Sequence, residues 1–440
     1  MPAELFLWGG YIALFAFLVH KGRSKDAVMS GSVGFGVQAF AYVATYISAV
    51  ALVGFGGLAH AYGLQMLLVA AGNVWFGTWM VYRFLAWPTR QWQERLGART
   101  PSQLLGKGHE SPWLTRALAL VFAVFLGVYA SAVIKGTALM LTEILPLPVW
   151  ALIWIVACVV GLAVFVGGLR GVLYTEAMQG VVMLVGITML VVAVFSRVGG
   201  PWQGILALSA LPPSTLATHG FTALSGGDQG VFILSLVVVT SIAVWAQPQM
   251  IQRHFAIADP RQLKRTTPLA MFILTVLVGG AYFAAALSRL ILPEVASPDD
   301  VMPQLVRLLL PEFALQIFVL AIVSASLSTA TAIYHIAVAA LAEDLTGRPS
   351  NRLTWFLGIV VCVLVSGGCA QIKGQLVSLL CTTSWSIVGA TALIPYVALV
   401  RFGQRSTAGA WASATCGFVA CLGWYLLAYG PTALVGPQFG

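Results

Sequence analysis

Long apolar runs alternate with short polar segments along this 440-residue chain. A run of about 18 or more apolar residues is long enough to cross a bilayer as a helix. No stretch sustains the period-two alternation of a barrel strand, so the runs predict helices. We expect about twelve membrane-spanning helices, over residues 4–20, 33–60, 63–86, 113–136, 149–167, 171–196, 229–250, 268–290, 313–342, 353–369, 375–400 and 409–429.

Composition agrees with this pattern, because 59% of the residues are hydrophobic and only 8% are charged. Soluble domains carry about 25% charged residues. The chain is therefore predicted to be an all-α polytopic membrane protein with the lipid bilayer as its surroundings. The six cysteines and six histidines are scattered and form no CxxC or HExxH pattern, which gives no sign of disulfides or a transition-metal site.

The basic residues predict an orientation in the membrane. Lys21, Arg23 and Lys25 follow the first apolar run, which argues against a cleaved signal and for an outside N-terminus. With twelve spans, 18 of the 23 lysines and arginines fall on the inner side. This bias fits a plasma membrane protein and explains the net charge of +9 without a nucleic-acid partner.

Two of the expected spans contain residues that interrupt helices. Gly54, Gly56 and Gly57 lie in the second span, and each costs a helix up to about 1 kcal/mol relative to alanine. Either the helix breaks there and frees carbonyls for a cation, or the glycines let a neighbour pack closely. In the seventh span, Pro248 removes a backbone donor and predicts a break or kink.

Interrupted helices five spans apart are typical of transporters built from two inverted repeats of five helices. The expected repeats cover residues 33–196 and 229–400. One extra, peripheral helix lies at each end, over 4–20 and 409–429, within a single transmembrane transporter domain. The solute site of such a protein lies at the interface between the repeats.

The ninth span carries small and hydroxyl side chains on one face. Ala325, Ser328 and Thr329 are spaced i, i+3 and i+4, so they lie together on a helix. Two hydroxyl oxygens suit a hard cation such as Na⁺. The alternative is that the hydroxyls bond their own helix or a neighbouring one, and this stretch alone favours that alternative.

Four stretches resemble the motifs of the sodium/solute symporter family, which includes the sodium/galactose, sodium/proline and sodium/pantothenate symporters. They are Gly167-Gly168-Leu169-Arg170 with residues 174–179, Gln247-Pro248 through Arg253, Ala325 through Thr329, and Glu343-Asp344-Leu345. The resemblance covers about residues 30 to 400. It implies a LeuT-like fold, with 5+5 inverted repeats, and alternating access driven by a sodium gradient.

The resemblance also implies which residues bind sodium. The backbone carbonyls of Ala44, Ile47 and Ala325 would combine with the hydroxyls of Ser328 and Thr329. All five positions match the family pattern. Together with an interrupted second span, this match reverses the preference at the ninth span in favour of a cation site, with Na⁺ as the coupling ion.

Other positions depart from the family pattern. Glu176 stands where an aspartate is usual, and we expect either an inner-side acid that gates or releases sodium, or a structural hydrogen-bonding group. Tyr46 replaces the substrate-side aspartate of sodium/proline members. Thr240 and Ala243 replace an asparagine and an aromatic residue of sodium/galactose members, which argues against a sugar. Many members also have a thirteenth span, but the twelve expected here contain the transport core.

The candidate solute-binding residues are aromatic or neutral and polar: Tyr42, Tyr46, Thr240, Trp245, Gln247, Thr383 and Trp385. We therefore expect a monomeric symporter that imports a small carboxylate or amino acid. A proton-coupled transporter using His335 or Glu176, and a transporter-like sensor, are the alternatives. An enzyme is disfavoured, since no nucleophile–base pair or paired carboxylates occur at membrane depth.

Overall fold

The computed structural model describes residues 2–22, 34–167, 172–224, 229–257, 259–372 and 376–429. All regular structure within these ranges is helical, which confirms the all-α prediction. In the same ranges nine helices are long and apolar enough to cross a membrane, or ten if one bent pair counts as a span. The count of twelve stays a prediction, and most of the Gly167–Arg170 motif lies outside the described residues.

The first half of the chain contains α1 (Pro2–Gly22), α3 (Phe35–Tyr46), the π-helical η1 (Val50–Gly54), α4 (Phe55–Tyr62), η2 (Gly63–Gln65), α5 (Met66–Val74), η3 (Trp75–Leu85), α6 (Ala86–Leu96), α7 (Pro101–Gly108), α8 (Pro112–Leu141), α9 (Val149–Gly167), α10 (Val172–Val198) and α11 (Pro201–Ser209). The second half contains α12 (Gln229–Val237), η4 (Val238–Ile242), η5 (Ala243–Ala246), α13 (Pro248–His254), α14 (Pro260–Leu274), η6 (Thr275–Gly279), α15 (Gly280–Leu287), η7 (Ser288–Leu290), η8 (Pro298–Asp300), α16 (Val301–Leu309), α17 (Glu312–Ala339), η9 (Ala340–Asp344), α18 (Arg352–Ala370), α19 (Val377–Phe402) and α20 (Thr407–Tyr429).

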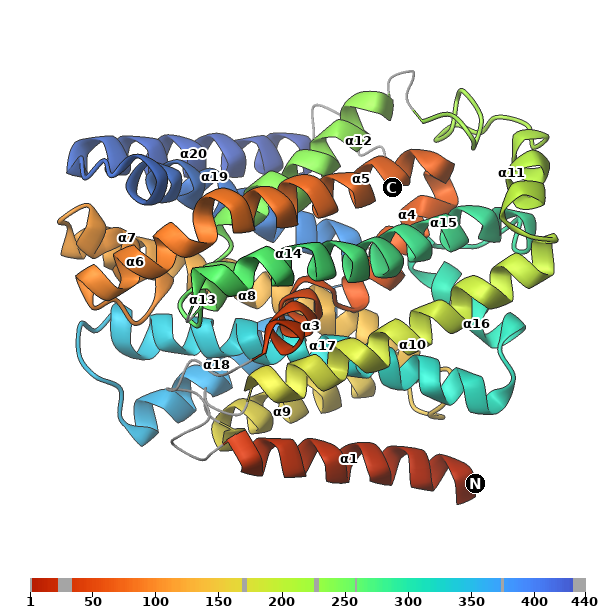
Figure 1. Ribbon diagram of the computed structural model, residues 1–440, viewed down its shortest axis with the longest axis horizontal. Coiled ribbons are helices and arrows are strands. Elements are labelled where there is room, and N and C mark those ends of the chain that lie inside the picture. Colours follow the sequence, from red (N-terminus) through yellow and green to blue (C-terminus); the bar gives the residue numbers. More distant parts are fainter. Residues whose placement is uncertain are drawn as a thin grey trace.

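The long helices run side by side, and α17 lies near the middle of the bundle (Figure 1). It packs against α8, α10 and α3, so its small and hydroxyl residues face other helices rather than lipid. Helices α1 and α20 lie along opposite edges. Of these two, α1 contacts α10 and α17, whereas α20 packs on α19.

The second expected span is broken, but not at its glycines. Helix α3 ends at Tyr46, because Ile47 has extended backbone angles (φ −99°, ψ 135°), and the chain becomes helical again at Val50. Gly54 lies beyond the break, where a Cβ would come 2.8 Å from the backbone nitrogen of Ser378. The glycines therefore serve close packing, and the break precedes them.

The seventh expected span is interrupted where Pro248 predicts it. The backbone of Gln247 is extended (ψ 124°), and α13 starts at Pro248. The helix before this point and α13 are bent by 49° relative to each other. The two interrupted helices meet, since the Tyr46 hydroxyl donates a 2.7 Å hydrogen bond to the Thr240 carbonyl.

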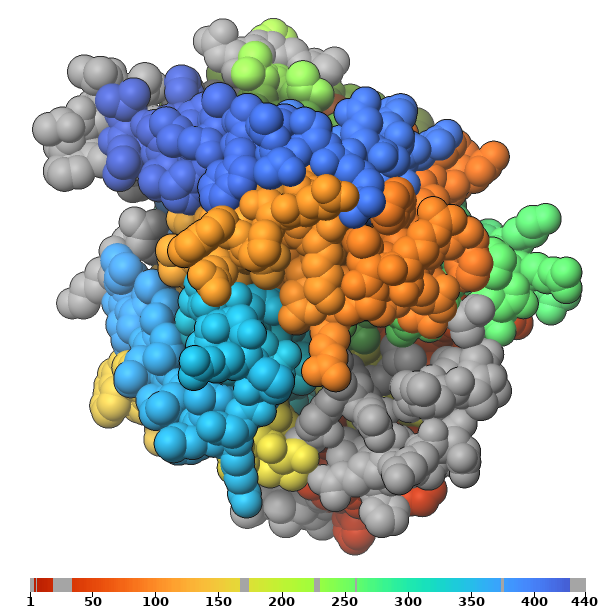
Figure 2. All heavy atoms as spheres, turned by 90° about the vertical axis from the view of Figure 1, so that its left-hand side faces the viewer, coloured from red at the N-terminus to blue at the C-terminus, as the bar shows by residue number. Residues whose placement is uncertain are grey.

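One end of the bundle is closed by α6, α7 and the end of α17 with η9, the face that Figure 2 shows. Helix α7 starts with a capped turn, because the Thr100 hydroxyl accepts a hydrogen bond from the Gln103 amide and Pro101 occupies the first position. Asp344 of η9 accepts hydrogen bonds from Thr100, Ser102 and Gln103. The carboxylate thereby ties α7 to the end of α17.

Candidate ion and solute site

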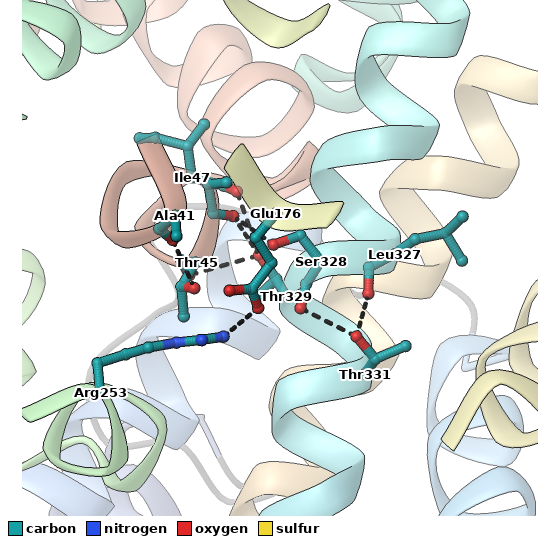
Figure 3. A network of polar contacts seen from close by, with 10 residues as sticks. Ala41, Thr45, Ile47, Glu176, Arg253, Leu327, Ser328, Thr329 and Thr331 are labelled. Carbon is teal, nitrogen blue, oxygen red and sulfur yellow. Dashed lines mark hydrogen bonds and ion pairs between the residues drawn. The ribbon is translucent and has the colours of Figure 1, made fainter. Parts of the chain in front are cut away.

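Oxygen atoms from α3 and α17 converge at the break after Tyr46 (Figure 3). The Ser328 hydroxyl donates to the Ala44 carbonyl at 3.1 Å. The Thr329 hydroxyl lies 3.1 Å from the Ile47 carbonyl and 3.4 Å from those of Ala44 and Thr45. All of these residues are buried. Four of the five predicted sodium-binding residues thus meet, and the fifth, Ala325, is buried one turn earlier on α17.

The arrangement follows from the break in α3. A helix leaves its last four carbonyls without intrahelical partners, and the end at Tyr46 frees those that face α17. Ser328 and Thr329 donate across to them. Thr331, on the same helix, instead bonds its own turn through the Leu327 carbonyl at 2.6 Å. The site is therefore an interhelical cluster of neutral oxygens, the donor set that hard cations prefer.

A buried ion pair lies beside this cluster and connects α10 with α13. Glu176 of α10 is 1% exposed and pairs through Oε1 with the guanidinium of Arg253 on α13. Its Oε2 has no hydrogen-bond partner among the described residues. The pair joins α10 to the second half of the interrupted seventh span.

A small cavity of about 20 Å³ lies beside the break. This volume holds about one water molecule. The lining is aromatic and uncharged: Tyr46, Ile47, Ser48, Val50, Ala51, Phe55, Asn73, Tyr129, Thr240, Tyr282, Cys381 and Trp385. Three predicted solute residues, Tyr46, Thr240 and Trp385, are therefore brought together. Sequence reasoning missed Asn73 and Tyr129, two buried polar groups in apolar spans.

Trp385 forms one wall of this cavity. Its ring makes edge contacts with Tyr46 and Tyr129, at centroid distances of 6.5 and 5.3 Å. Its indole N–H is buried and has no acceptor within the described part of the chain. An unsatisfied donor at a cavity wall costs free energy until an acceptor arrives. The Trp385 N–H is thus an unused hydrogen-bond donor in a residue that lines this cavity.

Four other predicted solute residues do not line this cavity. The Tyr42 hydroxyl donates to the Gly77 carbonyl at 2.9 Å, and its ring faces a separate cavity of about 30 Å³ beside Arg253. The Trp245 N–H donates to the Phe76 carbonyl at 2.9 Å. The side-chain amide of Gln247 donates a hydrogen bond to the backbone carbonyl of Trp385 at 3.1 Å. Thr383 lines neither cavity.

His335, the residue named for a proton-coupled alternative, packs toward α18. Its ring makes an edge contact with Trp355 at a centroid distance of 5.0 Å. It lines neither the cavity beside the break nor the one beside Arg253. Its ring contact is therefore with a helix outside the ion and solute cluster.

Broken helices that meet at a buried oxygen cluster define a secondary transporter of the LeuT-like class. A substrate-bound, outward-open Na⁺-coupled sialic acid symporter has the same fold, with a TM-score of 0.70, 15% identity and coverage of 96% of this chain and 98% of that one. The family model for the sodium:solute symporter family matches residues 28–417. The chain belongs to this family, as the sequence motifs predicted.

Two curated relatives with similar sequences are also sodium-coupled symporters. A sodium/pantothenate symporter of Haemophilus influenzae is 25% identical, over 75% of this chain and 69% of the relative. The sodium/pantothenate symporter of Escherichia coli is 29% identical, over 72% of this chain and 65% of the relative. These findings confirm a multi-pass membrane symporter for a small organic solute, with Na⁺ as the coupling ion.

Proposed function

We propose that the protein imports a small organic acid together with Na⁺, and that Na⁺ binds between α3 and α17. One observation carries the proposal: the Ser328 and Thr329 hydroxyls reach the carbonyls of Ala44 and Ile47 on the other helix. Those carbonyls with that of Ala325, and the two hydroxyls, supply five neutral oxygens. The same five positions match the family pattern for sodium.

Coupling follows from where the ion would bind. Sodium held by both helices favours the arrangement in which α3 and α17 are close, and it stabilises the cavity wall formed by Tyr46 on α3. Because linkage is reciprocal, the solute then raises the affinity for Na⁺ by the same factor. One Na⁺ moving inward at −100 mV contributes about 2.3 kcal/mol from the potential alone.

The cavity supports an organic acid as the solute. Its lining contains no charged side chain, so a solute with several charges would lack partners there, whereas a single carboxylate can be bound by neutral donors. The free N–H of Trp385 is a donor for a carboxylate oxygen, and the polar residues Tyr46 and Asn73 line the same cavity. The pantothenate relatives also take a carboxylate. An amino acid carries the same group and is the second expected substrate.

The proposal includes the orientation predicted from the basic residues. The N-terminus lies outside the plasma membrane, and the end with α6 and α7 faces the cytoplasm. A single chain forms the transport unit, and the solute crosses without chemical change.

The test is sodium-dependent stabilisation and uptake. Purified protein is screened by thermal shift against carboxylates and amino acids, in NaCl or in choline chloride of equal ionic strength. Solutes that stabilise it only with Na⁺ are then followed into proteoliposomes. We expect Ser328→Ala with Thr329→Val to weaken Na⁺ binding at least tenfold, because two of five ligands are lost.

Thr391→Val is the matched control. Thr391 is also buried, and its hydroxyl donates to a carbonyl of its own helix, that of Ile387, at 2.6 Å. It should keep the sodium response of the wild type. Equal uptake in K⁺, choline and Na⁺ would refute the proposal, and sodium-independent uptake driven by a pH gradient would favour proton coupling through Glu176.

A further inference from the structure

A third, larger cavity of about 750 Å³ lies at the end of the bundle that carries α6 and α7. Its walls come from the α6–α7 link, α7, the start of α8 and the loop after η9. It is separate from the ion and solute cluster, since it shares no lining residue with either small cavity. Figure 2 shows the face on which these segments meet.

Four cations from four segments surround this cavity: Arg99, Lys107, Arg116 and Arg348. Within the described ranges, none of the three arginines pairs with a carboxylate. Lys107 bonds only backbone carbonyls, those of Leu96 and Gly97. The cavity therefore holds cationic groups whose charge no acid side chain neutralises at close range.

The carboxylates in the same walls are already engaged. Asp344 is 3% exposed and accepts hydrogen bonds from three side chains of the α7 start. Glu110 pairs with Arg405 at 3.0 Å, and Glu343 accepts a hydrogen bond from Ser350 at 2.6 Å. The acids thus hold the walls in shape, and because Glu110 is paired outside the lining, four cations stand against two carboxylates in the walls, Asp344 and Glu343, that are unpaired within the described residues.

Two more features favour an anion there. The long helix α8 begins at Pro112 in the cavity wall, so the positive end of its dipole lies in it. Next to the wall, the Arg116 guanidinium stacks 4.7 Å above the ring of Trp113, which is 69% exposed. An exposed tryptophan at the start of a membrane helix is typical of the headgroup level of a bilayer.

We propose that this cavity binds a phosphate group, held by Arg99, Arg116 and Arg348. Arginine forks match phosphate oxygens, and one phosphate can accept from several of them. The bound group links the α6–α7 segment to the start of α8 and to the loop after η9. Phosphate chemistry can come from an anionic lipid headgroup or from a free phosphorylated solute, and the test distinguishes the two sources.

The experiment titrates the full chain in detergent with dioctanoyl phosphatidylglycerol, dioctanoyl phosphatidylcholine and pyrophosphate, by calorimetry and thermal shift at fixed ionic strength. A lipid site predicts saturable binding of phosphatidylglycerol that is stronger than the binding of either phosphatidylcholine or pyrophosphate. A site for a free phosphorylated solute predicts saturable binding of pyrophosphate itself. Either result supports the proposal.

Variants decide whether the cavity is the place of binding. The affinity for the anion should fall about tenfold in each of three variants, Arg99→Gln, Arg116→Gln and Arg348→Gln, because each loses a charge-assisted contact. Arg401→Gln removes an exposed arginine of α19 that does not line the cavity, and it should bind like the wild type. The proposal is wrong if neither anion binds saturably, or if Arg401→Gln weakens binding as much as the cavity variants.

Discussion

Glu176 and Arg253 are the most buried ion pair in the described part of the chain, with side chains 1% and 16% exposed. Removing two charges from water is costly, so such a pair adds little net stability. Removing one partner of the pair lowers stability strongly, because the remaining charge is left buried without its counter-charge. The pair therefore acts mainly as a specific link between α10 and α13.

We predict that Glu176→Gln lowers the unfolding free energy by about 3 kcal/mol or more, because Arg253 loses its counter-charge. Glu176→Asp, which keeps the charge, should lose much less. The double variant Glu176→Gln with Arg253→Gln should recover a large part of the loss, since no charge is left unpaired. Thermal unfolding of the four proteins measures this, and a double variant no more stable than Glu176→Gln would contradict it.

At the scale of elements, two glycines of α4, Gly56 and Gly57, allow this helix to pack closely against η8 and α16. A Cβ on Gly57 would overlap the carbonyl of Pro298 in η8, and one on Gly56 would press on Met302 of α16. Backbone atoms such as the Pro298 carbonyl cannot move aside as a flexible side chain can. The contact of α4 with η8 and α16 therefore depends on a missing methyl group.

Gly57→Ala should consequently destabilise the protein by about 1–3 kcal/mol through overpacking, and should lower the initial uptake rate by distorting this contact. Gly36→Ala is the control, since Gly36 lies in α3 of the same expected span and its Cβ would meet open space. That change should be neutral or stabilising by up to about 1 kcal/mol. Melting temperatures and initial uptake rates test the pair, and equal effects of the two changes would exclude the packing argument.

These contacts show where sequence reasoning succeeds and where it stops. Pro248 marks its break correctly, because a missing N–H acts locally. The glycines of the second span mislead about the position of the break, because tertiary packing decides whether a glycine stays helical. Ile47 carries no local signal for its extended backbone.

The solute cavity was the harder part to predict. In helices that are apolar all round, the hydrophobic pattern does not reveal which face points inward. Tyr42 and Tyr46 are one turn apart on α3, yet they face different cavities. Asn73 and Tyr129 come from spans with no recognisable motif, and only the packed helices place them beside Trp385.

At the scale of the whole molecule, the end opposite α6 and α7 is held by a buried acid. Asp299 of η8 is 5% exposed, and its Oδ2 accepts a 3.0 Å hydrogen bond from the Val377 amide at the start of α19. Burial raises the pKa of Asp299 to about 6, although the Val377 amide and Lys135 act in the opposite direction. The acid thus titrates within an easily accessible pH range.

Stability should therefore depend on pH through Asp299. Because its pKa is higher in the folded than in the unfolded protein, its stabilising contribution is complete below about pH 4 and is lost as pH rises to about 6. Relative to Asp299→Asn, the wild type should lose up to about 3 kcal/mol over this window and nothing further above it. Parallel melting-temperature curves of the two proteins from pH 4 to 8 would disprove this assignment.

The small size of the cavity beside the break has a consequence for how the protein takes up its solute. With room for about one water molecule, the space between the rings of Tyr46, Tyr129 and Trp385 is too small for an organic solute in this arrangement of the helices. Binding a solute there requires the helices that carry these rings to move apart, so uptake must include a step in which the cavity widens before it closes around the solute.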